Sequence, residues 1–179
     1  LNYESPMLRN PLKVEKNKQF FFGLASKGLY VTAEIPLTGF VCGQQVPLSI
    51  NVNNESNVEV TEIAVELVKF IHYNSEMPRR KTRERIEHTP VIQCAGVPVK
   101  SKFSVKTTML IPAVPPTTVG TCRILSHFYE IHVVAKTGAF HRDAVLRLPI
   151  TIGTVPLFAS QTGLYQQNQA PANLYPQVI

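Results

Sequence analysis

The chain has 179 residues, of which 44% are hydrophobic and 17% are charged, and its formal net charge is +6. This hydrophobic content excludes a chain that is disordered throughout, and the length fits one domain with flanking segments. The net charge permits contact with acidic lipid or acidic peptide but requires neither, because net charge bears on partners and solubility rather than on fold.

The cysteines and the apolar runs bear on where the protein works. Cys42, Cys94 and Cys122 are an odd, sparse set, which favours reduced thiols in the cytosol over a disulfide framework. No segment near the start has the basic-then-apolar form of a signal peptide, and no apolar run approaches the roughly 20 residues that cross a bilayer. We therefore expect a cytoplasmic protein, in which the sequon Asn54-Glu55-Ser56 would go unused.

The first part of the chain changes from irregular to alternating. Residues 1–22 are expected to form an interdomain linker, because prolines and scattered lysines break any period, and the run Phe20-Phe21-Phe22 is expected to supply a first buried anchor. The chain begins at Leu1 rather than at a methionine, so we also expect upstream residues. Period-two alternation then predicts strands over 29–35 and 46–52, with turn chemistry over 36–43 and 53–57.

The remaining elements also favour strands. Residues 60–73 are mostly β-branched and aromatic, and they predict a long strand; a short helix is the alternative, but no cap or glycine stop fits one. Residues 79–86 are charged and alternate, which predicts an exposed strand. Further strands are predicted, in chain order, over residues 103–111, 122–136 and 145–152. A proline-rich, extended connection is predicted over 112–120.

The strand count predicts the fold class. Seven or eight strands with short turns and no convincing helix indicate an all-β fold, a two-sheet antiparallel immunoglobulin-like β-sandwich over residues 23–157. After Leu157 the composition turns to Gln, Asn, Ala and Pro, so residues 158–179 are expected to form a flexible tail.

The search for catalytic chemistry yields no candidate. The chain has no GxSxG, P-loop, HExxH or CxxC motif, and its carboxylates are scattered. None of the five histidines has zinc spacing to another metal-type residue, and His127 and His132 are expected to face opposite sides of one strand. We therefore expect no enzyme activity, no metal and no cofactor.

Basic residues give the chain its one distinctive surface. In a strand, Arg79, Lys81, Arg83 and Arg85 would share one face, and further lysines could lie on a neighbouring strand. The candidate patch for anionic ligands is Arg79, Arg80, Lys81, Arg83, Arg85, Lys100, Lys102 and Lys106. One interpretation is a site for phosphoinositide headgroups or for acidic or phosphorylated peptides. The other is a solvated edge strand whose charge prevents edge-to-edge pairing. Nucleic acid is disfavoured, since no aromatic residues interleave with the basic run.

The closing strand has the most specific sequence in the chain, Leu148-Pro149-Ile150-Thr151-Ile152-Gly153-Thr154-Val155-Pro156-Leu157. This strand resembles the last strand of the C-terminal domain of the arrestin family, as found in α-arrestins and thioredoxin-interacting protein, and other segments agree in order. Weaker matches are residues 11–16, which resemble the segment leading into this domain, residues 28–43, which resemble its first hairpin, and residues 111–116, which resemble its proline-rich connection. The resemblance covers about residues 8–157.

The resemblance implies a cytosolic trafficking adaptor, peripheral at the plasma membrane and endosomes. Such proteins bind membrane receptors or transporters as cargo and recruit HECT-type ubiquitin ligases through PPxY motifs that bind WW domains. The chain departs from this pattern in two ways. It contains no PPxY, so ligase recruitment would use a motif outside residues 1–179, and Ser56 stands where thioredoxin-interacting protein has a reactive cysteine.

Three hypotheses are therefore open. The first is an adaptor domain that binds cargo and helps recruit a ligase. The second is a peripheral membrane module that binds anionic lipid or acidic peptide through the basic strand. The third, an extracellular immunoglobulin-like adhesion domain, is disfavoured because the chain has no tryptophan for a Cys…Trp…Cys core. A homodimer through exposed sheet edges is compatible with any of them.

Overall fold

In the computed structural model the protein is an all-β sandwich. The structure describes residues 6–20, 28–75, 77, 79–89, 92–118, 122, 124–138 and 141–157. Besides one 3-10 turn, η1 (Pro6–Arg9), it contains strands β1 (Leu12–Lys18), β2 (Leu29–Ile35), β3 (Gly39–Val41), β4 (Gln45–Asn54), β5 (Val60–Ser75), β6 (Lys81–His88), β7 (Ile92–Cys94), β8 (Ser101–Leu110), β9 (Leu125–Thr137) and β10 (Ala144–Gly153).

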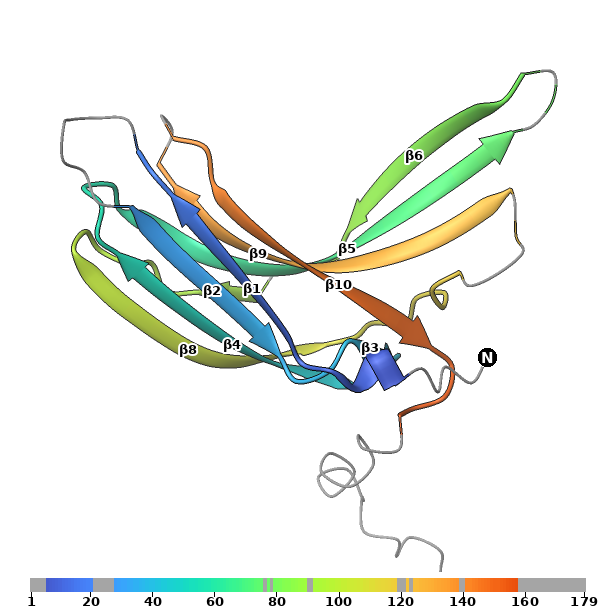
Figure 1. Ribbon diagram of the computed structural model, residues 1–179, viewed down its shortest axis with the longest axis horizontal. Helices are drawn as coiled ribbons and strands as arrows, with labels where there is room; N and C mark the ends of the chain where they lie inside the picture. Colours follow the sequence, from blue (N-terminus) through green and yellow to red (C-terminus); the bar gives the residue numbers. More distant parts are fainter. Residues whose placement is uncertain are drawn as a thin grey trace, which may run out of the picture.

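The strands form two sheets. One has the order β1-β2-β4-β8 and the other the order β3-β10-β9-β5-β6, with β7 also pairing with β5. All pairs are antiparallel except β3 with β10. The sheets do not overlap along their whole length: the β5–β6 hairpin and the start of β9 extend beyond the four-stranded sheet, at the upper right of Figure 1. This extension exposes both faces of the hairpin.

Alternating hydrophobic residues build the core between the sheets. Every second residue of β2 and β4 is buried, as in the series Leu29, Val31, Ala33 and Ile35, and β9 and β10 alternate in the same way. Because successive side chains of a strand point to opposite faces, this pattern gives each sheet one apolar face, and the two apolar faces pack together. The predicted all-β sandwich is confirmed, and residues 60–75 are strand rather than helix.

Three short or irregular elements differ from the sequence-based expectations. Residues 12–18 lie within the segment expected to be a linker, yet they form β1, an edge strand paired with β2 along its whole length. Residues 39–41 lie within an expected turn but pair with the end of β10. The expected strand over 122–136 begins only at Leu125. Phe20 is buried, as expected for an anchor; Phe21 and Phe22 lie outside the described residues.

Asn54 ties one end of the sandwich together. The side chains of Asn54 and Ser56 are completely buried. The Asn54 amide donates to the carbonyl oxygens of Val58 at 2.8 Å and Pro98 at 3.1 Å, and its Oδ1 accepts a hydrogen bond from the Ser56 hydroxyl at 2.6 Å. A glycan on Asn54 is incompatible with this packing, which agrees with the expectation that the sequon goes unused.

Tyr129 leads to a prediction about titration. Its ring lies in the core, and its hydroxyl donates to the carbonyl oxygen of Pro115 at 2.6 Å. Burial raises the pKa of Tyr129 to about 12, because the phenolate would lose its hydration. The unfolded chain releases this proton near pH 10. The contribution of the raised pKa to the free energy of unfolding is therefore present below about pH 10 and is lost as the pH rises toward the pKa of the folded protein. We expect Tyr129→Phe to leave the phenolate absorbance of the folded protein unchanged at about pH 10.5. An absorbance titration that loses one tyrosine's signal there would contradict the raised pKa.

Candidate functional site

The β5–β6 hairpin carries the residues that the sequence singled out. β6 lies at the edge of its sheet, and eight consecutive residue pairs join it to β5, from Val68 with His88 to Ser75 with Lys81. One face of the hairpin continues the core side of β5, and the other continues the outer face of the sheet. The two faces differ in chemistry, so each is described in turn.

The core-side face is basic. Lys81, Arg83 and Arg85 alternate along β6, and the turn before it brings Arg79 to the same side. A groove of about 400 Å³ is lined by Arg79, Lys81, Arg83, Tyr73 and Ile124, together with Asn74 and Ser75; we call it the basic groove. The predicted clustering of these cations on one face is therefore present.

The cations of this face fall into two groups. Glu87 lies near the base of the hairpin, where it pairs with the Lys69 ammonium at 3.2 Å and the Arg85 guanidinium at 3.0 Å. Lys69 is well covered, so this pair holds a largely desolvated charge. Toward the turn, the described part of the chain provides no ion pair to Arg79, Lys81 or Arg83. Among the described residues, ion pairs to Glu87 thus neutralise positive charge at the base of the hairpin, and none does so toward the turn.

The lysines that we grouped with this patch lie elsewhere, and that expectation was wrong. Lys102 and Lys106 are exposed on β8, and Lys100 lies in the turn before it with a left-handed backbone, φ 55°. β8 is an edge of the four-stranded sheet and pairs with β4, whereas β6 is an edge of the other sheet. Figure 1 shows the two strands at opposite ends of the molecule. Arg80 is exposed in the turn before β6.

The outer face of the hairpin is partly apolar. A groove of about 710 Å³ runs across β5, β9 and β10, and its outward-facing lining includes Phe70, His72, Glu84, Phe128, Arg147 and Pro149; we call it the outer groove. Phe128 is 42% exposed, and its ring lies 5.3 Å from that of His72, which in turn contacts Glu84 at 2.8 Å. The outer groove thus combines exposed aromatic surface with charges of both signs, which suits a peptide segment of mixed composition.

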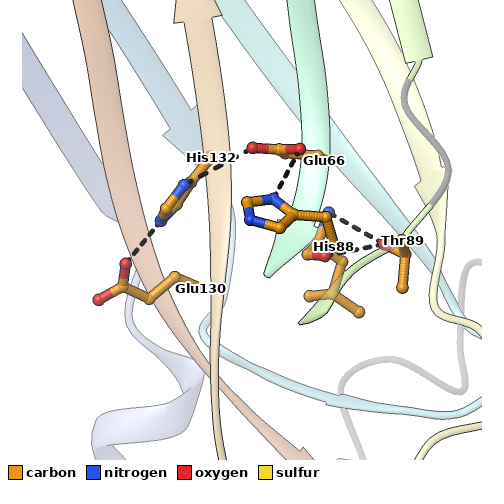
Figure 2. Close-up of polar contacts among 6 residues, drawn as sticks. Glu66, His88, Thr89, Glu130 and His132 are labelled. Atoms are coloured by element: carbon orange, nitrogen blue, oxygen red, sulfur yellow. Dashed lines mark hydrogen bonds and ion pairs between the residues drawn. The ribbon is translucent and has the colours of Figure 1, made fainter. Parts of the chain in front are cut away.

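Beside the outer groove lies a histidine–glutamate cluster that sequence spacing did not reveal (Figure 2). The nearly buried His132 contacts Glu130 at 2.7 Å and Glu66 at 3.8 Å, and the other Glu66 oxygen contacts His88 at 3.0 Å. These residues come from β9, β5 and β6, so only the strand register brings them together. The side chains of the cluster point outward, on the opposite side of β9 from His127, as the alternation along the strand predicted. Burial lowers the pKa of His127.

The cluster does not form a metal centre. No group of three His, Cys, Asp or Glu residues in the described ranges has an arrangement that could hold a metal ion. Next to the cluster, the Thr89 hydroxyl bonds to both backbone groups of Leu67, which fixes the end of β6 against β5 (Figure 2). The cluster therefore positions the hairpin relative to β9.

Two further observations concern the chain as a whole. Cys42, Cys94 and Cys122 are all free thiols, and burial raises the pKa of Cys94. The helical segments within the described ranges include none that is long and apolar enough to span a membrane.

Comparison with known proteins identifies the domain type. Residues 25–157 match the family described as Arrestin (or S-antigen), C-terminal domain. The chain is 26% identical over 157 residues to human (Homo sapiens) arrestin domain-containing protein 1, a match that covers 87% of this chain and 34% of the human protein. The mouse (Mus musculus) protein of the same name is 24% identical over the same shares. The chain thus spans about a third of the length of these relatives. The family match covers most of the chain and agrees with the observed sandwich, so the protein belongs to the arrestin family through its C-terminal domain.

Proposed function

We propose that this protein is a non-catalytic trafficking adaptor. In this role the domain binds the cytosolic segments of membrane receptors or transporters. The complete protein then couples this cargo to a HECT-type ubiquitin ligase, through a motif that residues 1–179 do not contain, and so promotes endocytosis and sorting. The protein acts in the cytoplasm, at the plasma membrane and endosomes.

Membership of the arrestin family is the observation that carries this proposal. The outer groove is an exposed feature with both apolar and charged lining. We assign cargo binding to it, because pockets for the side chains of an extended peptide give specificity and charged positions fix its register.

Site-specific photo-crosslinking in living cells tests this assignment. A photoreactive amino acid replaces Phe128 in the outer groove of the full-length protein, and in a second variant it replaces Tyr30. Both aromatic residues are 42% exposed, but Tyr30 lies on the four-stranded sheet. The matched exposure makes Tyr30 a control for random encounters.

We expect crosslinks from position 128 to be enriched in plasma-membrane proteins, and crosslinks from position 30 not to be. Equal yields of membrane proteins from the two positions would remove the outer groove as the cargo site. An absence of membrane proteins from both positions, with the protein expressed and folded, would contradict the adaptor function itself.

A further inference from the structure

Thr82 follows directly on a run of cations. The sequence Arg79-Arg80-Lys81-Thr82 makes it the only serine or threonine in the chain with arginines both two and three residues before it. Both arginines are exposed, and the described residues provide no ion pair to either. Protein kinases select substrates partly by the charge near the hydroxyl, and carboxylates of a kinase can pair with guanidinium groups. The spacing therefore fits the acceptor of an arginine-directed kinase.

The fold exposes this threonine. Thr82 is the second residue of β6, an edge strand, and it belongs to a run of six exposed residues from Lys81 to Ile86. The hairpin extends beyond the four-stranded sheet at the upper right of Figure 1. A kinase can therefore approach Thr82 from solvent.

The end of β6 can also open locally. Thr82 pairs with Asn74 of β5, and its hydroxyl donates to Asn74 Oδ1 at 2.9 Å. β5 is bonded on its other side as well, where the Asn74 N–H donates to the carbonyl oxygen of Ile124 at 2.8 Å, whereas β6 pairs, within the described ranges, with β5 alone. Strand ends with few buried contacts open at a low cost in free energy. Residues 79–83 can therefore enter a kinase as an extended segment while the rest of the domain stays folded.

We propose that Thr82 is the phosphate acceptor of an arginine-directed serine/threonine kinase, and that the phosphate regulates the outer groove. In the transfer, the Thr82 hydroxyl oxygen attacks the γ-phosphorus of ATP. The new O–P bond forms as the bond from that phosphorus to ADP breaks, and the hydroxyl proton passes to the catalytic carboxylate of the kinase. ADP leaves, and phosphothreonine remains on β6.

The phosphate would lie beside the outer groove. Thr82 and Glu84 are two residues apart on β6, so their side chains share the outer face at a spacing of about 7 Å. Glu84 lines the outer groove. Phosphothreonine carries about −1.5 to −2 charges at pH 7, and a spacing of about 7 Å is shorter than the screening length of about 8 Å at physiological salt. Phosphorylation should therefore weaken the binding of acidic cargo segments; this regulatory part rests on the proposed function.

Phosphorylation of the purified full-length protein tests the acceptor. The protein is incubated with ATP and the catalytic subunit of the cyclic-AMP-dependent protein kinase, an arginine-directed kinase, and mass spectrometry measures the phosphate at each site. The test variant carries Arg79→Gln and Arg80→Gln and keeps the hydroxyl. Thr108 is the internal control, because it is also exposed on an edge strand, β8, but follows Val105-Lys106-Thr107 and so has no arginine before it.

We expect phosphate on Thr82 of the folded wild type and at least about tenfold less on Thr108. The double arginine variant should slow phosphorylation of Thr82 by at least about tenfold, because its charge-assisted pairs with the kinase are lost. Equal rates at Thr82 and Thr108, or a wild-type rate in the arginine variant, would overturn the acceptor assignment. Phosphate that reaches Thr82 only after thermal unfolding would overturn it too, since the fold would then conceal the site.

Crosslinking from position 128 tests the regulatory part. Thr82→Glu places a negative charge at the site, and Thr108→Glu places the same charge on the other sheet. We expect Thr82→Glu to lower the yield of membrane proteins with acidic cytosolic segments by about threefold, and Thr108→Glu to leave it unchanged. Equal yields from the two variants would overturn the regulation. The phosphate measurement needs no cargo, so a failure of the proposed function, seen as a wild type that crosslinks no membrane proteins, is distinguishable from a failure at Thr82.

Discussion

Replacing Asn54 with alanine is expected to lower the free energy of unfolding by about 2–4 kcal/mol, because it removes several hydrogen bonds at once and takes away the Asn54 oxygen that accepts from the buried Ser56 backbone N–H. The carbonyl oxygens of Val58 and Pro98 and the hydroxyl of Ser56 all bond to the Asn54 side chain. Each buried group that stays unpaired costs about 1–3 kcal/mol, and water that enters the space recovers part of this cost. The loss is concentrated where the turn after β4 meets the connection between β7 and β8.

Equilibrium denaturation in urea measures this effect, with Asn51→Ala as the control. Asn51 lies on the same strand, three residues earlier, but its side chain is exposed, and within the described ranges its one side-chain hydrogen bond is accepted from the Ser104 hydroxyl. The control should change the free energy of unfolding by less than about 0.5 kcal/mol. Similar losses in the two variants would show that the Asn54 network does not hold this end of the sandwich.

Gly96→Ala is expected to destabilise the fold by about 2–3 kcal/mol, through backbone displacement rather than through a lost bond. A methyl group on Gly96 would lie 2.5 Å from the Thr61 carbonyl oxygen and 2.6 Å from that of Val60. These backbone atoms belong to β5, so relief requires the connection after β7 to move away from it. That movement would strain the paired hydrogen bonds between Val60 and Val97, at 3.0 and 2.7 Å.

Gly138→Ala is the matched control for this prediction. Apart from the glycine and its two chain neighbours, no heavy atom of the described residues lies within 4 Å of the methyl position at Gly138, so the change should stay within about 0.5 kcal/mol. Denaturation midpoints of the two variants can be compared in one experiment. If Gly96→Ala is as stable as Gly138→Ala, the close approach of the two chain segments is not required for stability.

The main strands could be predicted from sequence because their alternation is strong. Residues 29–35 and 46–52 show one apolar face, and β-branched residues distinguish β5 from a helix. β1 was missed for a physical reason: it is an edge strand with only Leu12 and Val14 as apolar residues, and its other residues are polar and mostly exposed. β3 has three residues and pairs with a strand more than 100 residues later, which no local pattern reveals.

The candidate site shows the same division between local and non-local information. The basic face of β6 depends on alternation within one segment, so it could be read from the order of residues 79–85. The error at Lys100, Lys102 and Lys106 arose because sequence proximity does not specify which sheet a strand joins. Likewise, the contacts among Glu66, His88 and His132 depend on the register of three strands, and spacing along the chain carries no information about that register.

The central claim, that the protein is a membrane-cargo adaptor, is tested most directly by the turnover of surface proteins. In cells that lack the protein, we expect some surface-biotinylated receptors or transporters to carry less ubiquitin and to be internalised more slowly. Wild-type protein should restore both the ubiquitination and the internalisation rate of these surface proteins, and so should the Tyr30→Ser variant. Phe128→Ser, which changes an equally exposed aromatic residue in the outer groove, should not. If no surface protein changes its ubiquitination or internalisation when the protein is removed, the adaptor account is wrong.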